Sequence, residues 1–224
     1  MGTARNGMAD DARARGKVCG LLATIFRAEP SEDFIKELKT PGFSDVLSDM
    51  GVSLGDEFYK NSSPLLTESL AVEYTRLFIG PGSHISPHES VFVNVDGSEG
   101  GLWGEKTVEV KKFIETAGFE YQPDFTGLPD HVGAELEFMQ KLAETEARLW
   151  SDGEAERADW CLRVQKKFID EHLSKWVPDF CDEVIKNAEL PFYRELAKVT
   201  RSFIEFERDA IASMTSDAAQ GAHA

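Results

Sequence analysis

Residues 130–149 read DHVGAELEFMQKLAETEARL and give the clearest secondary-structure signal in the chain. Their apolar side chains recur at intervals of three and four residues, at Val132, Leu136, Met139, Leu142 and Leu149. This spacing places them along one face of an α-helix, which would be buried against other elements. Asp130 is a good N-cap residue, because its carboxylate can accept a hydrogen bond from an N–H of the first turn. The stretch therefore predicts a long amphipathic helix that begins just after Asp130.

The same helical spacing continues on both sides of this stretch. Apolar residues repeat in this way over residues 10–27, over 154–176 and in a segment that begins near Pro191. The sequence also predicts five shorter helices. The first is capped by Ser31 and ends at Leu38, and the others cover residues 43–50, Pro64 through Phe78, residues 105–116 and a segment that starts at Pro178. We therefore expect an all-α fold, a single-domain bundle of about ten helices.

Two long stretches interrupt the helices near the middle of the chain. Residues 80–90 read GPGSHISPHES, and two prolines with two glycines exclude a helix there. Val91–Val95 is short and has no evident partner strand, so we expect it to be extended loop, followed by a turn cluster over 97–104. A second loop covers Gly118–Pro129. Long ordered loops in a compact bundle are uncommon and usually functional, so we look for function here.

Composition limits the classes of partner. The chain has 224 residues and a net charge of −16, which argues against binding nucleic acid or an anionic membrane surface. Its three cysteines are widely spaced and form no CxxC pair, which fits a reducing compartment. The apolar stretch 18–26 is too short to span a bilayer, so we expect a cytoplasmic protein. Flexible termini are predicted over 1–9 and 214–224, on either side of a helical domain over 10–213.

Few residues suggest chemistry. The chain has no HExxH, GxSxG or phosphate-loop motif, and no ExxH pair on a helix that would supply a di-iron site. The remaining candidates are His84, His88 and Glu89 in the first loop and the Asp130–His131 pair, with Glu135 nearby. They could form a metal or acid–base centre, but capping and hydrogen bonding explain them as well. We expect no resident metal or cofactor.

Aromatic residues gather around the first loop, namely Tyr74, Phe78, Phe92 and Trp103. Such a cluster is more often core than a ligand platform. Beside a rigid loop in an acidic protein, however, it could line an apolar groove with an acidic rim. A peptide with an apolar centre and basic flanks would fit that groove.

Three segments, taken in order, resemble the TorD/DmsD family of redox-enzyme maturation chaperones. The first is EYTRLFIGPG at 73–82, followed by PHESV at 87–91. The second is LPDHVGAELEFM at 128–139. The third includes Glu171-His172-Leu173 and Trp176, then PFY at 191–193. The resemblance covers about residues 15 to 205, which is nearly the whole chain.

This resemblance implies a helical chaperone, not an enzyme. It would bind the twin-arginine leader of a molybdopterin oxidoreductase and delay export until the cofactor is inserted, as a monomer or a domain-swapped dimer. Carried over to this sequence, with Trp103 added from the aromatic cluster, the peptide-binding candidates are Tyr74, Leu77, Phe78, Pro87, Glu89, Ser90, Val91, Trp103, Asp130 and His131. Many members have Pro-Pro where this chain has Pro87-His88, so its loop has one fixed φ fewer.

A physical mechanism follows from these candidates. Apolar residues of the leader would fill a groove lined by Leu77, Phe78, Val91 and Trp103. Its arginines would pair with carboxylates such as Glu89 or Asp130. The apolar part should carry most of the affinity, because rim ion pairs contribute only about 0–1 kcal/mol each. Phe78→Ala or Asp130→Ala should then weaken leader binding. Two alternatives stay open at this point, an enzyme centred on His84, His88, Glu89 and His131, and a helical scaffold that only oligomerises.

Overall fold

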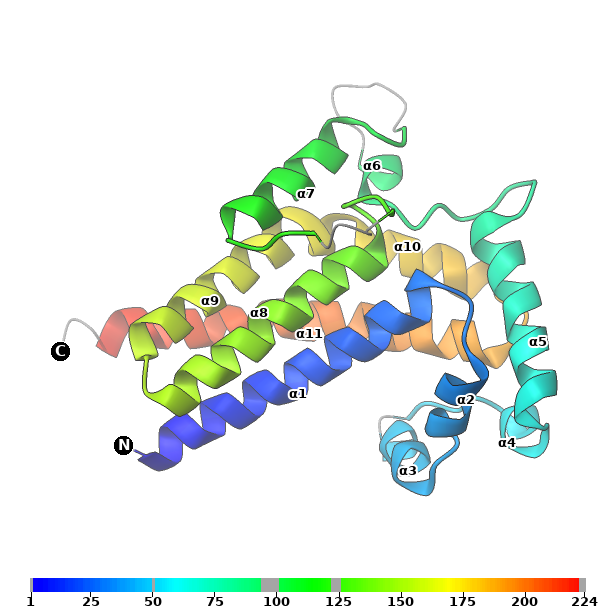
Figure 1. Cartoon of the computed structure of the whole chain (residues 1–224), viewed down its shortest axis with the longest axis horizontal. Coiled ribbons are helices and arrows are strands. Elements are labelled where there is room, and N and C mark those ends of the chain that lie inside the picture. The colour runs from blue at the N-terminus through cyan, green and yellow to red at the C-terminus, as the bar shows by residue number, and fades with distance from the viewer. Residues whose placement is uncertain (1, 50, 94–100, 122–125, 222–224) are drawn as a thin grey trace.

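The computed structural model describes residues 2–49, 51–93, 101–121 and 126–221, which form helices and one isolated β-bridge but no strand (Figure 1). The α-helices are α1 (Gly2–Arg27), α2 (Glu32–Leu38), α3 (Pro41–Asp49), α4 (Asp56–Lys60), α5 (Ser63–Tyr74), α6 (Glu89–Phe92), α7 (Glu105–Thr116), α8 (Val132–Asp152), α9 (Ala155–Phe168), α10 (Ser174–Asn187) and α11 (Pro191–Gly221). Two π-helical turns are η1 (Thr75–Ile79) and η2 (Ile169–Leu173). The prediction of an all-α fold with about ten helices is confirmed.

The long helices α1, α8, α9, α10 and α11 form the body of the molecule (Figure 1). Each contributes the apolar face that its sequence spacing predicts, and the largest side chains are shielded from solvent. Fully buried examples are Leu22, Leu136, Phe168, Trp176 and Tyr193. Burying one such apolar side chain contributes about 1.5–3 kcal/mol, so these faces supply the main stabilisation of the fold.

Helices α1 and α8 approach each other closely, and Gly133 makes this approach possible. A Cβ at Gly133 would lie 3.1 Å from the backbone carbonyl oxygen of Ala23 and 3.2 Å from the Cβ of Arg27. Backbone atoms cannot move aside as the end of a flexible side chain can, so a larger residue would push the helices apart. The glycine therefore brings the start of α8 against the end of α1.

Helices α2 to α5 form a separate layer over one end of the bundle, at the right of Figure 1. The hydroxyl of Tyr193 in α11 donates a hydrogen bond to the carbonyl oxygen of Leu70 in α5 at 3.1 Å. The carboxylate of Glu73 accepts hydrogen bonds from the backbone N–H groups of Glu189 and Leu190, just before α11 begins. These bonds fix α5, which leads into the first loop, to the long C-terminal helix.

The prediction that a helix starts at Pro178 is wrong. The turn η2 interrupts the helix predicted over 154–176, and α10 begins at Ser174 with Pro178 inside it. Pro178 has no backbone N–H, so it cannot donate the helical hydrogen bond to the carbonyl oxygen of Ser174, the first residue of α10. One backbone hydrogen bond of the helix is therefore lost. Phe168, Leu173 and Ser174 all have right-handed helical dihedrals, so the backbone stays helical from α9 through η2 into α10 and Pro178 lies inside this continuous helix.

Three other segments differ from the sequence analysis. Val91 and Phe92 lie in α6, so the extended loop predicted over Val91–Val95 is wrong for these two residues. The rest of that loop and most of the turn cluster over 97–104 lie outside the described residues. Helix α4 was not predicted. The structure continues α1 and α11 into residues 2–9 and 214–221, and the flexibility of these ends stays a prediction.

No helix in the described part of the chain is both long enough and apolar enough to cross a bilayer.

Candidate functional site

The turn η1 continues α5, and the first loop begins directly after it, at Gly80. The N–H of Gly80 donates to the carbonyl oxygen of Thr75 at 2.6 Å and closes the π-helical turn. The candidates Tyr74, Leu77 and Phe78 are buried on the inner face of this helix. The hydroxyl of Tyr74 donates to the carbonyl oxygen of Phe26 at 2.9 Å. All three side chains therefore belong to the core beneath the loop.

The structure joins the two loops that the sequence singled out. The N–H of Glu89 donates to the carbonyl oxygen of Asp130, and the N–H of Val132 donates to that of Pro87, both at 2.9 Å. Between them His88 and His131 form an antiparallel bridge, with ring centroids 5.0 Å apart in an edge-to-face contact. The two segments thus form one continuous surface, although the chain between them is long.

A buried polar cluster lies beneath this junction. The side chains of Glu89, Asp130 and Glu135 are completely buried. Asp130 accepts a hydrogen bond from the backbone N–H of Ser90 at 3.0 Å, so its carboxylate caps the short helix α6. The carboxylate of Glu89 lies 2.9 Å from Nδ1 of His172 in η2. Burying a carboxylate is costly unless it is hydrogen-bonded, and these contacts reduce that cost.

Glu135 is the third acidic member, and its surroundings favour the protonated form of its carboxyl group. Burial first, and then the nearby charge of Glu89, raise the pKa of Glu135 well above its usual range. Its Oε2 accepts a hydrogen bond from Nε1 of Trp176 at 3.1 Å. Among the described residues, Oε1 of Glu89 and Oε1 of Glu135 have no conventional partner, and a proton held between the two carboxyl groups satisfies both. This arrangement therefore favours one additional proton in the cluster.

The prediction that Asp130 caps α8 is wrong, because His131 is the capping residue. Nδ1 of His131 accepts a hydrogen bond from the N–H of Gly133 at 3.0 Å. Burial, together with the charges of His88 and Arg27, lowers the pKa of His131 to about 3. The ring is therefore neutral at neutral pH, as an acceptor must be. Asp130 lies one position before this N-cap, and its Oδ2 accepts the hydrogen bond from Ser90 instead.

The other sequence candidates lie around the junction. Pro87 and Ser90 are buried, and Val91 is half-buried. Trp103 is 75% exposed and has a positive φ of 66°, and it makes no ring contact with the described aromatic residues. Phe78 and Phe92 both pack on Phe180. Tyr74 packs on Phe78, so the structure brings together three of the four clustered aromatic side chains and leaves Trp103 apart.

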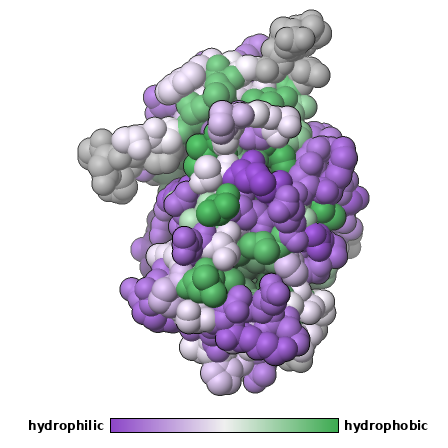
Figure 2. Space-filling view, turned by 90° about the vertical axis from the view of Figure 1, so that its right-hand side faces the viewer, coloured by the Kyte–Doolittle hydropathy of each residue, from purple (hydrophilic) through white to green (hydrophobic). Residues whose placement is uncertain are grey.

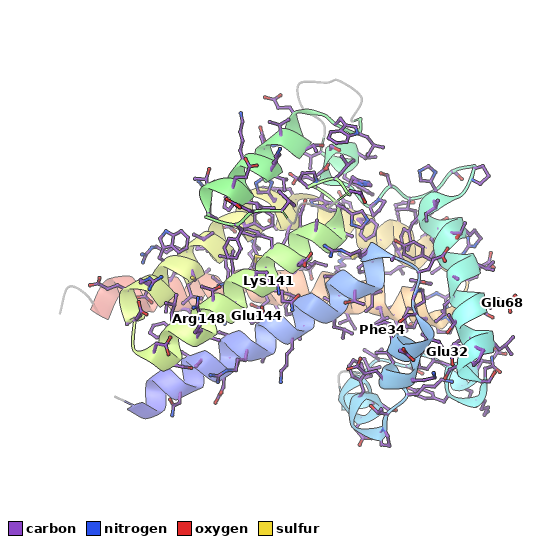
Figure 3. The ribbon with its side chains drawn as sticks, in the orientation of Figure 1. Glu32, Phe34, Glu68, Lys141, Glu144 and Arg148 are labelled. Atoms are coloured by element: carbon purple, nitrogen blue, oxygen red, sulfur yellow. The ribbon has the colours of Figure 1, made fainter. Side chains whose placement is uncertain are left out.

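An open cleft of about 600 Å³ adjoins the second loop, with His131 in its wall. Its apolar lining comes from Ile114, Phe119, Leu128, Ala134 and Phe138. Glu120 and Glu137 supply the acidic part of the cleft. The guanidinium of Arg27 already forms an ion pair with Glu137 across the cleft. Lys141 stands at its edge, and Figure 3 shows it beside Glu144 on the exposed side of α8.

A smaller recess of about 430 Å³ lies beneath the first loop. Leu77 and residues 80–85 line it, together with Val72 and Arg76 of the preceding helix. The first loop contributes residues 80–85 to this recess, and the second loop contributes residues 126–128 to the cleft beside His131. Each of the loops thus borders an opening in the surface.

The described residues do not assemble a metal site. Among them no three histidine, cysteine, aspartate or glutamate side chains converge as ligands. His84 is exposed, with Nδ1 3.3 Å from the carbonyl oxygen of Gly82, whereas Glu89 is buried against His172. The residues of the enzyme alternative are therefore occupied by capping and structural hydrogen bonds.

The sequence analysis did not identify the roles of Glu135, His172 and Trp176. A signal was present for Glu135, because it stands three residues after Val132 and four before Met139 on the apolar face of its helix. A charged residue at a core position indicates a buried polar partner. Nothing in the sequence identified Trp176 as that partner.

Several known proteins are similar to this chain. The family model of the nitrate reductase delta subunit matches residues 43–182. The chaperone protein TorD of Shewanella piezotolerans is 23% identical over 219 residues, which cover 90% of this chain and 94% of that protein. The Tat proofreading chaperone DmsD of Salmonella typhi is 30% identical over 135 residues, which cover 60% of this chain and 58% of that protein.

A solved structure shares the fold. It is a putative redox enzyme maturation protein from Archaeoglobus fulgidus, which matches with a TM-score of 0.53 and 23% identity. The match covers 85% of this chain and 93% of that chain. The similarity thus extends over most of both molecules.

Proposed function

This chain belongs to the TorD/DmsD family of redox-enzyme maturation chaperones, and from that membership we propose that it binds the twin-arginine leader of a molybdopterin oxidoreductase. It acts in the cytoplasm and retains its client until the cofactor is inserted. Its role is binding and not catalysis. The observation that carries the proposal is the junction of the two loops beside a cleft with an apolar lining and two carboxylates.

The cleft beside His131 suits the chemistry of such a leader. Its apolar lining can bury the hydrophobic part of the peptide at about 25 cal/mol per Å² of apolar area. Glu137 already pairs with one guanidinium, that of Arg27, so the cleft accommodates the group that the leader presents. Glu120 is exposed and supplies a second carboxylate at the same cleft. Two arginines and an apolar segment thus find matching groups within one opening.

The burial of Glu89 and Asp130 suggests a different role for these two candidates. Their carboxylates are completely buried and engaged with His172 and Ser90. An arginine of the leader would have to break these contacts to reach them, which would leave buried groups unpaired. We therefore propose that Glu89 and Asp130 hold the two loops in place, while Glu120 and Glu137 meet the leader.

The direct test is titration of the purified full chain with a synthetic leader peptide from a molybdoenzyme encoded nearby, followed by calorimetry. We expect a Kd in the micromolar range or below, and Phe119→Ala should weaken binding about fivefold to twentyfold, because its ring forms one wall of the cleft. The matched control is Glu144→Gln, an exposed change on the same helix as Glu137. No binding by the wild type, or equal Kd values for Phe119→Ala and the wild type, would contradict the proposal.

Arg27 provides a second test with the opposite sign. Its guanidinium occupies Glu137 in the free protein, so the leader must displace it. Arg27→Gln should therefore tighten leader binding about twofold to fivefold, which corresponds to a rim ion pair of up to about 1 kcal/mol. Glu137→Gln should weaken binding by a similar factor. The same calorimetric titration measures both, and a weaker Kd for Arg27→Gln would contradict the assignment of Glu137 to a leader arginine.

A further inference from the structure

A groove runs between α7 and α9, which lie next to each other at the upper left of Figure 1, and continues over η2 to the start of α10. We call it the basic groove. Its volume is about 910 Å³, which is larger than either opening described above. The basic side chains that line it are Lys106, Lys112, Arg163, Lys167 and Lys175. Only three acidic side chains, Glu109, Asp170 and Glu171, line it as well, so the groove is positively charged in a chain with a net charge of −16.

The acidic side chains of the basic groove already have cationic partners. The carboxylates of Glu109, Asp170 and Glu171 lie 2.6, 2.6 and 3.8 Å from the Nζ atom of a lysine. Three exposed cations of the groove, by contrast, form no ion pair within the part of the chain that the structure describes. They are Lys112, Arg163 and Lys175. The groove therefore presents positive charge that its own carboxylates do not neutralise.

The wall of the groove between these cations is apolar and partly aromatic. Phe113 of α7 is half-buried, and Nζ of Lys167 lies 5.5 Å from the centre of its ring in a cation–π contact. Trp160 of α9 is 44% exposed, and Val164 follows it one turn later on the same wall. An accessible tryptophan is a frequent anchor in binding surfaces, because it offers a large and rigid contact area. The groove thus combines apolar contact area with a cationic edge.

We propose that the basic groove binds an acidic peptide segment of a partner protein, in which carboxylates flank an apolar side chain. The carboxylates pair with Lys112, Arg163 and Lys175, and the apolar side chain packs on Trp160. Such a segment is opposite in charge to the twin-arginine leader. No residue that lines the basic groove also lines the cleft beside His131. The inference therefore goes beyond the proposed function and does not depend on it.

The spacing of the cations favours an extended peptide over a compact anion. Arg163 and Lys175 are twelve residues apart on a backbone that stays helical, so a rise of 1.5 Å per residue places their Cα atoms about 18 Å apart. A single phosphate group is too small to contact both cations at once. An extended peptide covers about 3.3 Å per residue, so about six residues span this distance. Several carboxylates along one chain therefore match the groove.

The unpaired cations are what directs a partner to this groove. Exposed apolar groups also occur elsewhere, as at the α5 end of the molecule, which Figure 2 faces and where hydrophobic patches are separated by hydrophilic ones. Apolar contact alone would not distinguish these surfaces, whereas complementary charge does. Each exposed ion pair contributes little and is screened by salt. We therefore expect binding of modest affinity that weakens as the salt concentration rises.

Fluorescence anisotropy of a labelled peptide tests the inference with the purified full chain. The probe is a synthetic peptide with glutamates on both sides of one phenylalanine, and the control peptide has glutamine in place of each glutamate. The acidic peptide should bind with a Kd of about 10–100 μM at about 50 mM salt, at least about tenfold more tightly than the control peptide. Raising the salt concentration to about 300 mM should weaken its binding about threefold to tenfold.

Variants on both walls of the groove locate the site. Lys112→Gln combined with Arg163→Gln removes one cation from each wall and should weaken binding of the acidic peptide about fivefold to twentyfold. The matched control is Lys17→Gln combined with Arg148→Gln, which lowers the net charge equally at exposed positions outside the groove. Trp160→Ala should weaken binding about threefold to tenfold, with an unchanged circular dichroism spectrum because this side chain is exposed.

Three outcomes would overturn the inference. Equal Kd values for the acidic and the control peptide would show that the cations do not contribute. Equal losses in the groove variant and its matched control would assign binding to the overall charge of the protein. Tighter binding of inorganic triphosphate than of the peptide, unaffected by Trp160→Ala, would assign the groove to a phosphorylated compound. The groove variant should bind the leader peptide with the Kd of the wild type, so this inference and the proposed function can each fail alone.

Discussion

Replacing Glu135 with glutamine tests whether the cluster beneath the two loops holds an extra proton. Glutamine has the shape of a protonated glutamic acid. Its carbonyl oxygen can accept the hydrogen bond from Nε1 of Trp176, and its amide can donate to Glu89. If Glu135 is neutral in the folded protein, Glu135→Gln keeps every contact. If it were ionised, the variant would instead remove a buried charge from a site arranged around it.

The sign of the pH dependence follows from the raised pKa. The folded protein keeps the proton on Glu135 at pH values where the unfolded chain, with an ordinary pKa of 4.5, has lost it. The free energy of unfolding of the wild type therefore falls as the pH rises from that ordinary value toward the raised pKa, by up to about 1.4 kcal/mol per pH unit. Glu135→Gln lacks this proton. Its stability relative to the wild type should rise by up to about 2.7 kcal/mol over two pH units in that window.

Urea unfolding, followed by circular dichroism at several pH values from about 5.5 to 8, measures this difference. Burial raises the pKa of Glu207 to about 7, so stability also falls with pH through that group, but equally in both proteins. The exposed change Glu144→Gln should follow the wild type at every pH. A constant difference between Glu135→Gln and the wild type across this range would refute the reasoning, as would a variant several kcal/mol less stable throughout.

Two further predictions concern stability and use the same urea assay. Glu73→Ala should lower the free energy of unfolding by about 2–4 kcal/mol, because two backbone N–H groups before α11 lose their acceptor. The control Glu57→Ala changes an exposed residue and should lower the free energy of unfolding by less than about 0.5 kcal/mol. Equal losses in the two variants would contradict the role of Glu73 as that acceptor. Gly153→Ala should cost about 1 kcal/mol, because this C-cap has a positive φ of 80°. By contrast Gly42→Ala, in a helix with no atom near its Cβ position, should be neutral or stabilising, and a larger loss there than at Gly153 would be inconsistent with this explanation.

The candidates Phe78 and Asp130 need a different interpretation from the one that the sequence suggested. Both side chains are buried, so Phe78→Ala and Asp130→Ala should reduce stability as well as leader binding. Glu137→Gln separates binding from folding better, because the side chain of Glu137 is 40% exposed, whereas Phe119 also packs on the buried Phe138. Comparing the two kinds of variant distinguishes residues that hold the loops from residues that contact the leader.

The sequence alone determined most of the helices, with α4, α6 and the start of α10 as exceptions, because each predicted helix depends on local spacing and on residues at its ends. The apolar positions from Val132 to Leu149 predicted α8, and Ser31 caps α2 as predicted, with its hydroxyl 3.2 Å from the N–H of Phe34. Pro64 stands at the start of α5, as its fixed φ requires. These features involve partners within about one turn, so a single stretch of sequence contains the information.

Tertiary structure alone decided which polar groups face the core. Asp130 and His131 are adjacent and both can cap a helix. In the structure His131 caps α8, while Oδ2 of Asp130 accepts a hydrogen bond from Ser90 of the other loop. Glu89 looks like an exposed loop residue until His172 lies against it. The protonation of a carboxyl group depends on its burial and its neighbours, and these are set by segments far apart in the chain. The sequence therefore determined where the two loops lie along the chain, while packing determined that their charged side chains support the site from within.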